Sequence, residues 1–469
     1  MLRLFRHYVV AHAVILACCE FVALSSLLYI IFSYIADSGL GLTETARPQV
    51  IALVTVAASM GMTAVGLYNR DHFMQMRDVV TRAVVALTLV VGVLLAVQAI
   101  YHWVGGGVSD RGYRLLCTAG LGLFLPILLG IRRLFRAALR RFSRLHRRVA
   151  VIGTGPRAAK IVTWWRNPEV RPFTLVGFLG LGLEPAPAAD LRGGAHLGVA
   201  PEELRRFCVE NRVDEVVVAA ADRRGLPVRD LLGCKLAGVR VIDYATFWER
   251  ETGQVDLEEV TPGWLAFSDG FQQSGLYEAA ARAVDIVVSL ALLLLTLPVT
   301  LATAALIKLE SPGPVFYRQP RVGLHGKVFE VLKFRSMRTD AEKDGPRWAA
   351  ARDSRVTRVG AVIRKVRIDE IPQVINVLRG EMSFVGPRPE RPVFVEELAR
   401  KIPYYESRHE VKPGITGWAQ INYPYGASHE DARRKLSYDL YYIKNRSLFL
   451  DAIIILQTVK VLLWNDGAR

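Results

Sequence analysis

The chain has 469 residues, of which 51% are apolar, and its formal net charge at pH 7 is +16. So apolar and yet so basic a composition is unusual for a water-soluble globular protein. It is typical of a membrane protein whose cytoplasmic parts face anionic headgroups and phosphorylated substrates. Nucleic-acid binding is the other common use of such a charge. The sequence argues against it, because it contains no helix-turn-helix, zinc-finger or RNP-like pattern.

Four apolar segments open the sequence, and each is close to the ~20 residues that a helix needs to cross a bilayer. They cover residues 8–35, 50–67, 83–104 and 113–131. Arg3 and Arg6 precede the first segment, and eight arginines between residues 132 and 148 follow the fourth with no acidic residue among them. Because basic loops stay in the cytoplasm, we expect both the N-terminus and everything after residue 131 on that side, with the arginine run facing lipid headgroups.

The next segment, residues 148–250, has the pattern of a small Rossmann-like α/β domain. Apolar runs at 149–152, 175–179, 215–219 and 239–242 alternate with helix-like segments, which predicts a parallel sheet. The first run ends in Gly153-Thr154-Gly155-Pro156-Arg157-Ala158, a turn that could hold a phosphate at a helix N-terminus.

This glycine turn departs from a dinucleotide site in two ways. Pro156 lies inside the turn, and the second apolar run ends in glycine rather than in the acidic residue that binds a ribose. We therefore expect a structural or regulatory nucleotide-fold domain with no NAD requirement, and a bound dinucleotide is the alternative.

A linker over residues 251–276 leads to a fifth apolar segment, 286–307, which is long enough to cross a membrane. The residues after it are as basic as those before it, so both of its ends are expected in the cytoplasm. Pro298 lies within the segment, where it removes a backbone donor and predicts a sharp bend. We therefore predict a re-entrant helix over 280–309, broken at Pro298, that enters the inner leaflet and turns back. The last apolar stretch, 448–464, is more polar and predicts an interfacial helix.

Between residues 311 and 368 the chain carries 14 Lys/Arg against 5 Asp/Glu, a balance that attracts phosphates. Asp369 and Glu370 follow directly. A helix start at Pro372, together with Arg364 and Arg367, would keep the carboxylate of Asp369 ionised. An ionised carboxylate can attack phosphorus or bind Mg²⁺. An adjacent acidic pair is also common on a solvated surface, so spacing alone leaves both interpretations open.

Two later segments add rigid loops with groups that suit a nucleotide sugar. Residues 383–390 combine a glycine turn and two prolines with Arg388, whose planar fork fits a phosphate. Residues 412–422 form a second Gly/Pro loop with a tryptophan and side-chain amides. A third segment, 439–445, precedes the last helix.

From about residue 277 to 464 the chain resembles the bacterial sugar transferase family, the polyprenyl-phosphate hexose-1-phosphate transferases. The resemblance rests on several motifs in order: Lys333-Phe334-Arg335-Ser336-Met337, Asp369-Glu370 with Pro372-Gln373, Phe384-Val385-Gly386-Pro387-Arg388-Pro389, and Pro413-Gly414-Ile415-Thr416-Gly417-Trp418-Ala419-Gln420. The four N-terminal spans and the α/β domain resemble the large members, which are typical exopolysaccharide initiators.

The resemblance implies transfer of a hexose-1-phosphate from a UDP-sugar, with glucose first and galactose next, to undecaprenyl phosphate with release of UMP. It makes Asp369 the nucleophile of a phosphosugar-aspartate intermediate, Glu370 its partner in binding Mg²⁺, and Arg364 a supporting residue. The substrate-binding residues that it implies are Lys333, Arg335, Pro387, Arg388, Pro389, Lys412, Thr416 and Gln420. Two positions depart from the family: Leu297 stands where Ser often precedes Pro298, and Lys412 stands where many relatives have Arg.

The predicted fold is a membrane protein with four transmembrane helices (1–147), a cytoplasmic Rossmann-like α/β domain (148–250), a linker (251–276) and a mostly α catalytic domain anchored by the re-entrant helix (277–469). We expect a multi-pass protein of the bacterial inner (cytoplasmic) membrane, with catalysis on its cytoplasmic face. The expected partners are a UDP-sugar, undecaprenyl phosphate and anionic membrane lipids, with no nucleic acid. The identity of the sugar, the role of the α/β domain and a homo-oligomeric state stay open.

Two alternatives belong to other classes. A membrane-bound nucleotide-sugar dehydratase would also join four spans to a nucleotide-binding domain, but it needs a Tyr-x-x-x-Lys couple that residues 148–249 lack. A non-enzymatic scaffold of a polysaccharide export complex would retain the motifs without activity.

Overall fold

The computed structural model describes residues 2–4, 7–9, 11–37, 47–68, 76–103, 110–141, 147–166, 173–180, 196–197, 203–222, 224, 226–260, 263, 267–268, 270–271, 274–341, 354–424, 426 and 428–464. Arg6 and Arg144, two of the arginines that flank the apolar segments, lie outside this set. The chain divides into two compact units. The first comprises Met1–Leu2 and Tyr8–Gly253, and the second comprises Arg3–His7 and Gln254–Arg469. We call the second the catalytic unit, because it contains the predicted catalytic residues Arg364, Asp369 and Glu370.

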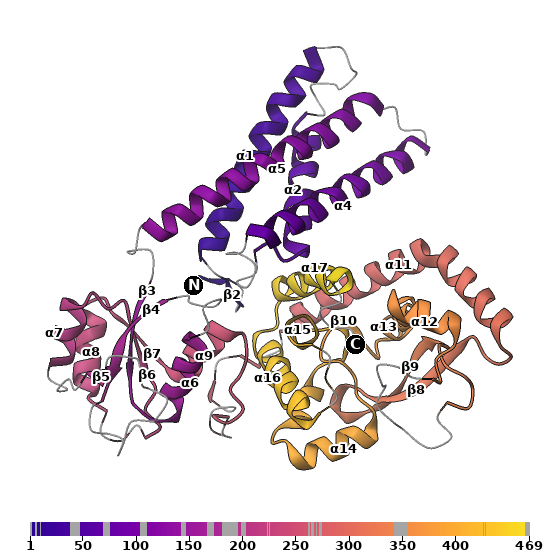
Figure 1. Cartoon of the computed structure of the whole chain (residues 1–469). Helices are drawn as coiled ribbons and strands as arrows, with labels where there is room; N and C mark the ends of the chain where they lie inside the picture. The colour runs from indigo at the N-terminus through magenta and orange to yellow at the C-terminus, as the bar shows by residue number, and fades with distance from the viewer. Residues whose placement is uncertain are drawn as a thin grey trace. The chain divides into compact units, whose positions relative to one another are not determined.

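The first four apolar segments are helices that pack as a bundle. In it α1 contacts α2 and α5, and α4 contacts the same two helices (Figure 1). Their bounds are α1 Ala11–Asp37, α2 Arg47–Ala64, α4 Met76–Trp103 and α5 Asp110–Arg141. Three of them are long and apolar enough to cross a membrane, whereas the apolar part of α2, Pro48–Ala64, is shorter. With α11, described below, the described residues contain four such helices, which supports a multi-pass membrane protein.

The arginine run does not begin where the helix ends, because α5 continues to Arg141. Its first member, Arg132, is buried and donates from Nε to Glu20 Oε1 of α1 across 2.6 Å. Arg132 Nη1 also donates to the carbonyl of Leu67 at 3.1 Å, and the Tyr68 hydroxyl donates to Glu20 Oε2 at 2.7 Å. A buried arginine needs such an ionic partner. The expectation that the whole run faces headgroups is therefore wrong for Arg132.

The predicted parallel sheet is confirmed. Five parallel strands lie in the order β5-β4-β3-β6-β7, so that the first strand in sequence is central. The strands are β3 Arg147–Ile152, β4 Phe173–Leu179, β5 His196–Leu197, β6 Glu215–Val218 and β7 Arg240–Asp243, of which the short β5 had no sequence signal.

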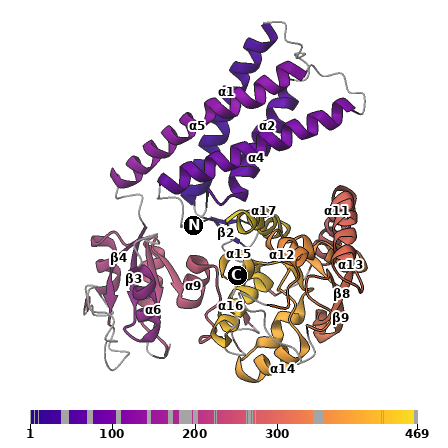
Figure 2. The same ribbon diagram turned by 45° about the vertical axis from the view of Figure 1, so that its right-hand side comes forward.

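Helices cover both faces of this sheet (Figures 1 and 2). They are α6 Pro156–Trp165, α7 Leu204–Glu210, α8 Val228–Leu236 and α9 Tyr244–Thr252. Successive side chains of β3 point to opposite faces of the sheet, so alternate residues pack against different helices. Val149 and Val151 pack with α6 and α9, whereas Ala150 and Ile152 pack with α7 and α8.

The glycine turn after β3 is explained by packing. Gly153 has φ +112°, and a Cβ there would lie 2.8 Å from the backbone nitrogen of Ala220, just beyond β6. Only glycine allows this approach. Arg157, in the first turn of α6, donates to the Ala220 carbonyl at 2.9 Å. The residues of the turn thus join the ends of two adjacent strands.

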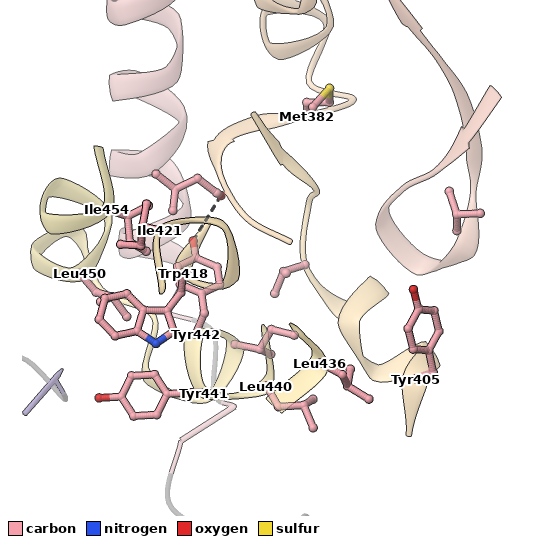
Figure 3. Packing of buried hydrophobic residues seen from close by; sticks show 14 of the residues in the cluster. Met382, Tyr405, Trp418, Ile421, Leu436, Leu440, Tyr441, Tyr442, Leu450 and Ile454 are labelled. Carbon is pink, nitrogen blue, oxygen red and sulfur yellow. Dashed lines mark hydrogen bonds between the residues drawn. The ribbon is translucent and has the colours of Figure 1, made fainter. Parts of the chain in front are cut away.

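The catalytic unit consists mostly of helices, as expected, with two small sheets (Figure 1). Its helices are α11 Gly275–Glu310, α12 Arg358–Lys365, α13 Gln373–Arg379, α14 Pro392–Lys401, α15 Trp418–Asn422, α16 His429–Asn445 and α17 Leu448–Trp464. The strands β8 Phe316–Val322 and β9 Val328–Phe334 form an antiparallel hairpin, and β10 Ser383–Val385 pairs in parallel with β11 Gly414–Thr416. Its core gathers around Trp418, Leu440, Tyr441 and Ile454 (Figure 3).

Helix α11 contains the fifth apolar segment and is the fourth helix that could cross a membrane by length and composition. It changes direction along its length (Figure 1), but it remains helical through Pro298, so the expected break at this residue is wrong. In its first half, Arg282 donates to the carbonyls of Val377 and Leu378 in α13, and Asp285 accepts from the backbone nitrogen of Phe384 at 3.0 Å. Helix α11 is thereby fastened to the two elements that flank the candidate site.

Candidate functional site

The Asp369-Glu370 pair lies in a short 3-10 turn, Ile368–Glu370, between α12 and α13. Helix α12 begins at Thr357, whose side chain accepts from the backbone nitrogen of Gly360. The residue before the turn, Arg367, adopts a left-handed conformation with φ +59°, which is uncommon for a side chain of this size. Such backbone strain is often found at functional sites.

Glu370 is surrounded by cations. Its Oε1 lies 3.0 Å from Lys333 Nζ of β9, 2.9 Å from Arg388 Nη2 and 3.9 Å from Arg367 Nη1. Burial alone would raise the pKa of Glu370, but the charges of Lys333, Arg388 and Arg367 hold that pKa well below its usual range. Glu370 is therefore ionised, and it orders three cations around itself.

Asp369 has the opposite electrostatic setting. It is 8% exposed, and its Oδ1 is buried without a hydrogen-bond partner in the described part of the chain. Burial and the neighbouring charge of Glu370 raise the pKa of Asp369, while Lys333, Arg367 and Arg364 act in the other direction. The expectation that the nearby arginines keep this carboxylate ionised omitted its burial, which reverses the direction of the shift.

A buried carboxylate oxygen is normally satisfied by a hydrogen-bond donor, a water or a cation. Among the described residues no three His, Cys, Asp or Glu side chains come together as a metal site. Mg²⁺ does not need such a cage, since it commonly takes one or two carboxylates with substrate phosphates and waters. The oxygens of Asp369 and Glu370 fit this donor set, with the open Oδ1 of Asp369 as the clearest ligand.

Arg388 reaches Glu370 because two rigid loops lie side by side. The pairing of β10 with β11 brings the loop after Val385 against the Pro413–Gly417 segment. Two backbone hydrogen bonds of 2.9 Å join them: Gly386 N donates to Thr416 O, and Gly414 N donates to Pro387 O. A Cβ on Gly386 or Gly414 would collide with the facing backbone. Glycine at these positions thus allows the contact.

Two arginine side chains from other elements also bind the backbone of the Pro387–Pro389 loop. Arg408 Nη2 donates to the carbonyl of Arg388 at 2.9 Å, and Arg321 Nη1 donates to that of Pro389 at 3.1 Å. Arg408 is itself anchored by Asp439 at 2.9 Å, within a pair that is almost fully buried. These bonds fix the backbone from which the Arg388 side chain extends.

Two other candidates lie nearby with different contacts. Arg364, in the last turn of α12, is half-buried, and its charge acts on Asp369. Arg335 is buried, and its guanidinium donates to the carbonyls of Ser311 at 2.8 Å and Pro312 at 2.9 Å. It therefore satisfies backbone groups at the C-terminal end of α11.

The other three predicted substrate-binding side chains lie against other parts of the same unit, and their role in substrate binding stays a prediction. Lys412 Nζ would lie 3.8 Å from a Cβ on Gly380, at the end of α13. Thr416 Oγ1 is 2.7 Å from Thr458 Oγ1 of α17. Gln420 Nε2 donates to the Ile415 carbonyl at 3.0 Å, and its Oε1 is buried without a partner in the described structure. Within the described residues, no hydrogen bond or ion pair joins these three side chains to Asp369 or Glu370.

Sequence reasoning named Arg367 only as a charge near Asp369 and did not name Arg408. The left-handed backbone of Arg367 has no sequence signature. Arg408 lies in a polar stretch without a motif, and its partner Asp439 was noted only as part of the segment 439–445. Only the fold brings Arg408 to the carbonyl of Arg388.

Residues 276–465 match the family model described as bacterial sugar transferase. The chain is 46% identical over 241 residues to a UDP-N-acetylgalactosamine-undecaprenyl-phosphate N-acetylgalactosaminephosphotransferase of Aeromonas hydrophila, covering 51% of this chain and 56% of that protein. It is 36% identical over 377 residues to the undecaprenyl-phosphate glucose phosphotransferase of Komagataeibacter xylinus, covering 78% and 68%. It is 34% identical over 384 residues to the UDP-glucose:undecaprenyl-phosphate glucose-1-phosphate transferase of Xanthomonas campestris pv. campestris, covering 79% and 77%. The aligned region is thus little more than half of the Aeromonas protein.

Proposed function

Because the chain belongs to the bacterial sugar transferase family, we propose that it transfers a hexose-1-phosphate from a UDP-sugar to undecaprenyl phosphate and releases UMP. The observation that carries this proposal is the buried Oδ1 of Asp369, which has no partner in the described structure and lies next to a Glu370 that orders three cations. A carboxylate oxygen without a hydrogen bond, next in sequence to a residue that gathers three cations, suits attack on a phosphorus atom.

In the proposed first step, a carboxylate oxygen of Asp369 forms a bond to the phosphorus that carries the sugar. The bond from this phosphorus to the bridging oxygen breaks, and UMP leaves with the electron pair. Lys333, Arg367 and Arg388 lie within 4 Å of Glu370 and would bind the diphosphate oxygens as charge shifts toward UMP. In the second step a phosphate oxygen of undecaprenyl phosphate attacks the same phosphorus and displaces Asp369.

Mg²⁺, held by Asp369 and Glu370, would supply charge neutralisation for the diphosphate. The protein's own cations, Lys333 among them, would add positive charge at the diphosphate. The pKa of Lys333 is lowered by its burial, and Glu370 opposes this shift, so the ion pair keeps the ammonium available for a phosphate.

The proposed membrane arrangement is a re-entrant α11 that enters the inner leaflet from the cytoplasm and returns at Pro298. A straight helix of 36 residues would be roughly 54 Å long. Yet Arg282 and Asp285 fasten its first half to α13 and β10, and Arg335 binds carbonyls at its other end. Attachment of both ends to one compact unit supports a return to the same side. The catalytic unit would then face the cytoplasm at the inner membrane, where the UDP-sugar is available.

For the Rossmann-like domain we propose a structural or regulatory role without NAD. The packing of Gly153 against Ala220 supports this, since it explains the glycine without a phosphate. The proposed biological role is initiation of exopolysaccharide repeat units, with glucose as the first sugar to test. Two of the relatives are named for glucose and the third for N-acetylgalactosamine.

The test is UMP release by the purified protein with undecaprenyl phosphate, Mg²⁺ and a panel of UDP-glucose, UDP-galactose and UDP-N-acetylgalactosamine. UMP release that depends on the lipid supports the transferase. Conversion of a UDP-sugar without UMP release would favour the dehydratase, and no reaction with any sugar would favour the scaffold.

A further inference from the structure

His7 lies in the segment Arg3–His7, which precedes the first membrane helix in sequence but packs with the catalytic unit. Its side chain is 8% exposed, and its Nδ1 lies 3.0 Å from the hydroxyl of Tyr441 in α16. In Figure 3 the faint indigo ribbon beside the Tyr441 hydroxyl belongs to this N-terminal segment.

The ring of His7 sits against three aromatic side chains from three consecutive helices. Its centroid is 5.2 Å from that of Trp418 in α15, 6.0 Å from that of Tyr441 and 6.5 Å from that of Phe449 in α17. The first two contacts are edge-to-face, the geometry that aromatic pairs prefer. We call Trp418, Tyr441 and Phe449 the aromatic socket.

Burial of the imidazole lowers the pKa of His7 to about 4. The ring is therefore neutral at physiological pH, and it acts through packing and one hydrogen bond rather than through charge. A neutral ring can enter an apolar socket without the cost of burying a cation.

The aromatic socket is connected to the candidate site by a short series of contacts. Trp418 directly follows Gly417, where a Cβ would collide with the carbonyl oxygen of Gly386. Two residues after Gly386, Arg388 extends to Glu370 at 2.9 Å. A shift of Trp418 would thus be transmitted through backbone contacts to Arg388, the cation that pairs with Glu370.

We propose that His7 is a positioning residue for the catalytic unit, holding the Gly417–Trp418 turn against the loop that carries Arg388. Since α1 begins at Ala11, the same docking makes a second chain connection between the catalytic unit and the membrane helices, in addition to the one that passes through Gly253. The effect of this docking on turnover rests on the proposed function, whereas the docking itself does not.

The experiment compares full-length wild type with His7→Ala, His7→Phe and the control His429→Ala. His429 belongs to the same unit but is exposed, and it pairs with Glu397 at 2.9 Å. Hydrogen–deuterium exchange over residues 414–422 reports docking without any substrate. UMP release reports the consequence for turnover, and exchange in β3 and β6 of the other unit reports any general unfolding.

We expect His7→Ala to raise exchange over 414–422 and to lower kcat roughly tenfold, as a small misplacement of catalytic groups does. His7→Phe refills the aromatic socket and should recover protection and most of the activity, while His429→Ala should match wild type. Wild-type exchange in His7→Ala, or no recovery in His7→Phe, would overturn the proposal. If wild type releases no UMP, the proposed function fails, and the exchange data still decide whether His7 docks.

Discussion

Arg388 and Glu370 are joined by a 2.9 Å ion pair that links the Gly-Pro-Arg-Pro loop to the turn of the proposed nucleophile. The backbone of Arg388 is held separately, through Arg408. The side chain can therefore exchange its carboxylate partner for a phosphate without loss of loop position. In the proposed mechanism, the pair keeps the Arg388 guanidinium oriented at Glu370, the residue after Asp369, until the substrate binds.

This arrangement predicts different results for two substitutions of Arg388. Arg388→Ala removes a charge-assisted contact to the diphosphate and should lower kcat/KM by about 10²–10³-fold. Arg388→Lys keeps the charge but loses the planar fork, so we expect an intermediate loss with KM affected more than kcat. Steady-state UMP release checks both variants. Equal activity of Arg388→Ala and wild type would exclude Arg388 from the site.

The pH dependence of turnover should follow the raised pKa of Asp369. Only the ionised carboxylate can attack phosphorus, so kcat/KM should rise with pH through this pKa. The acid limb should then lie above the usual range of an aspartate, which is around 3.9. Mg²⁺ bound to this carboxylate would lower its pKa, so a profile of kcat/KM against pH at limiting Mg²⁺ measures the position of the limb, and higher Mg²⁺ should move it to lower pH.

Two variants should move this limb in opposite directions. Glu370→Gln removes a negative charge that raises the pKa of Asp369, so the limb should shift to lower pH. Lys333→Met removes a positive charge that lowers this pKa, so the limb should shift to higher pH. Both variants will be slower than wild type. The prediction concerns the direction of the shift, and a shift of both variants in the same direction would contradict it.

The covalent step predicts a trapped intermediate. Asp369→Asn keeps the shape of the side chain but cannot displace UMP, so turnover should fall by several orders of magnitude. Wild-type protein given a radiolabelled UDP-sugar without lipid should retain sugar-phosphate, and the Asn variant should not. Glu370→Gln should also be severe, and added Mg²⁺ should restore part of its activity. Equal labelling of wild type and Asp369→Asn would exclude Asp369 as the nucleophile.

The secondary structure was predictable where local patterns determine it. Apolar length located α1, α4, α5 and α11, which could cross a membrane, and also the shorter α2, and apolar runs located four of the five strands of the parallel sheet. The strand β5 has only two residues, His196 and Leu197, too few for a pattern. The extension of α5 into the arginine run also escaped prediction, because basic residues are good helix formers and do not end a helix.

The electrostatics of the site were less predictable, because they depend on burial and on distant partners. Charge spacing around Asp369 favoured an ionised carboxylate, whereas desolvation raises its pKa. The partners of Arg132 and His7 lie 112 and 434 positions away in the chain. The position of the Lys412 ammonium at the end of α13 likewise depends on the fold. Contacts between residues so far apart in the chain cannot be predicted from local sequence patterns.

The buried pair of Arg132 and Glu20 gives a prediction about the membrane helices. Arg132→Met leaves the fully buried Glu20 without its cation, and breaking a buried pair in this way costs about 3–5 kcal/mol. The neighbour Arg133 is exposed on the same helix, so Arg133→Met should change stability by less than about 0.5 kcal/mol. The double variant Glu20→Leu/Arg132→Met removes both charges and should recover most of the loss.

Unfolding of the three variants in detergent, followed by helical circular dichroism, measures these differences. We expect Arg132→Met to unfold first, with Arg133→Met and the double variant close to wild type. If Arg133→Met were as unstable as Arg132→Met, the loss would reflect the general charge of the arginine run. If the double variant were no better than the single one, the contact of Arg132 with the Leu67 carbonyl at 3.1 Å, rather than the ion pair, would account for the stability of the bundle.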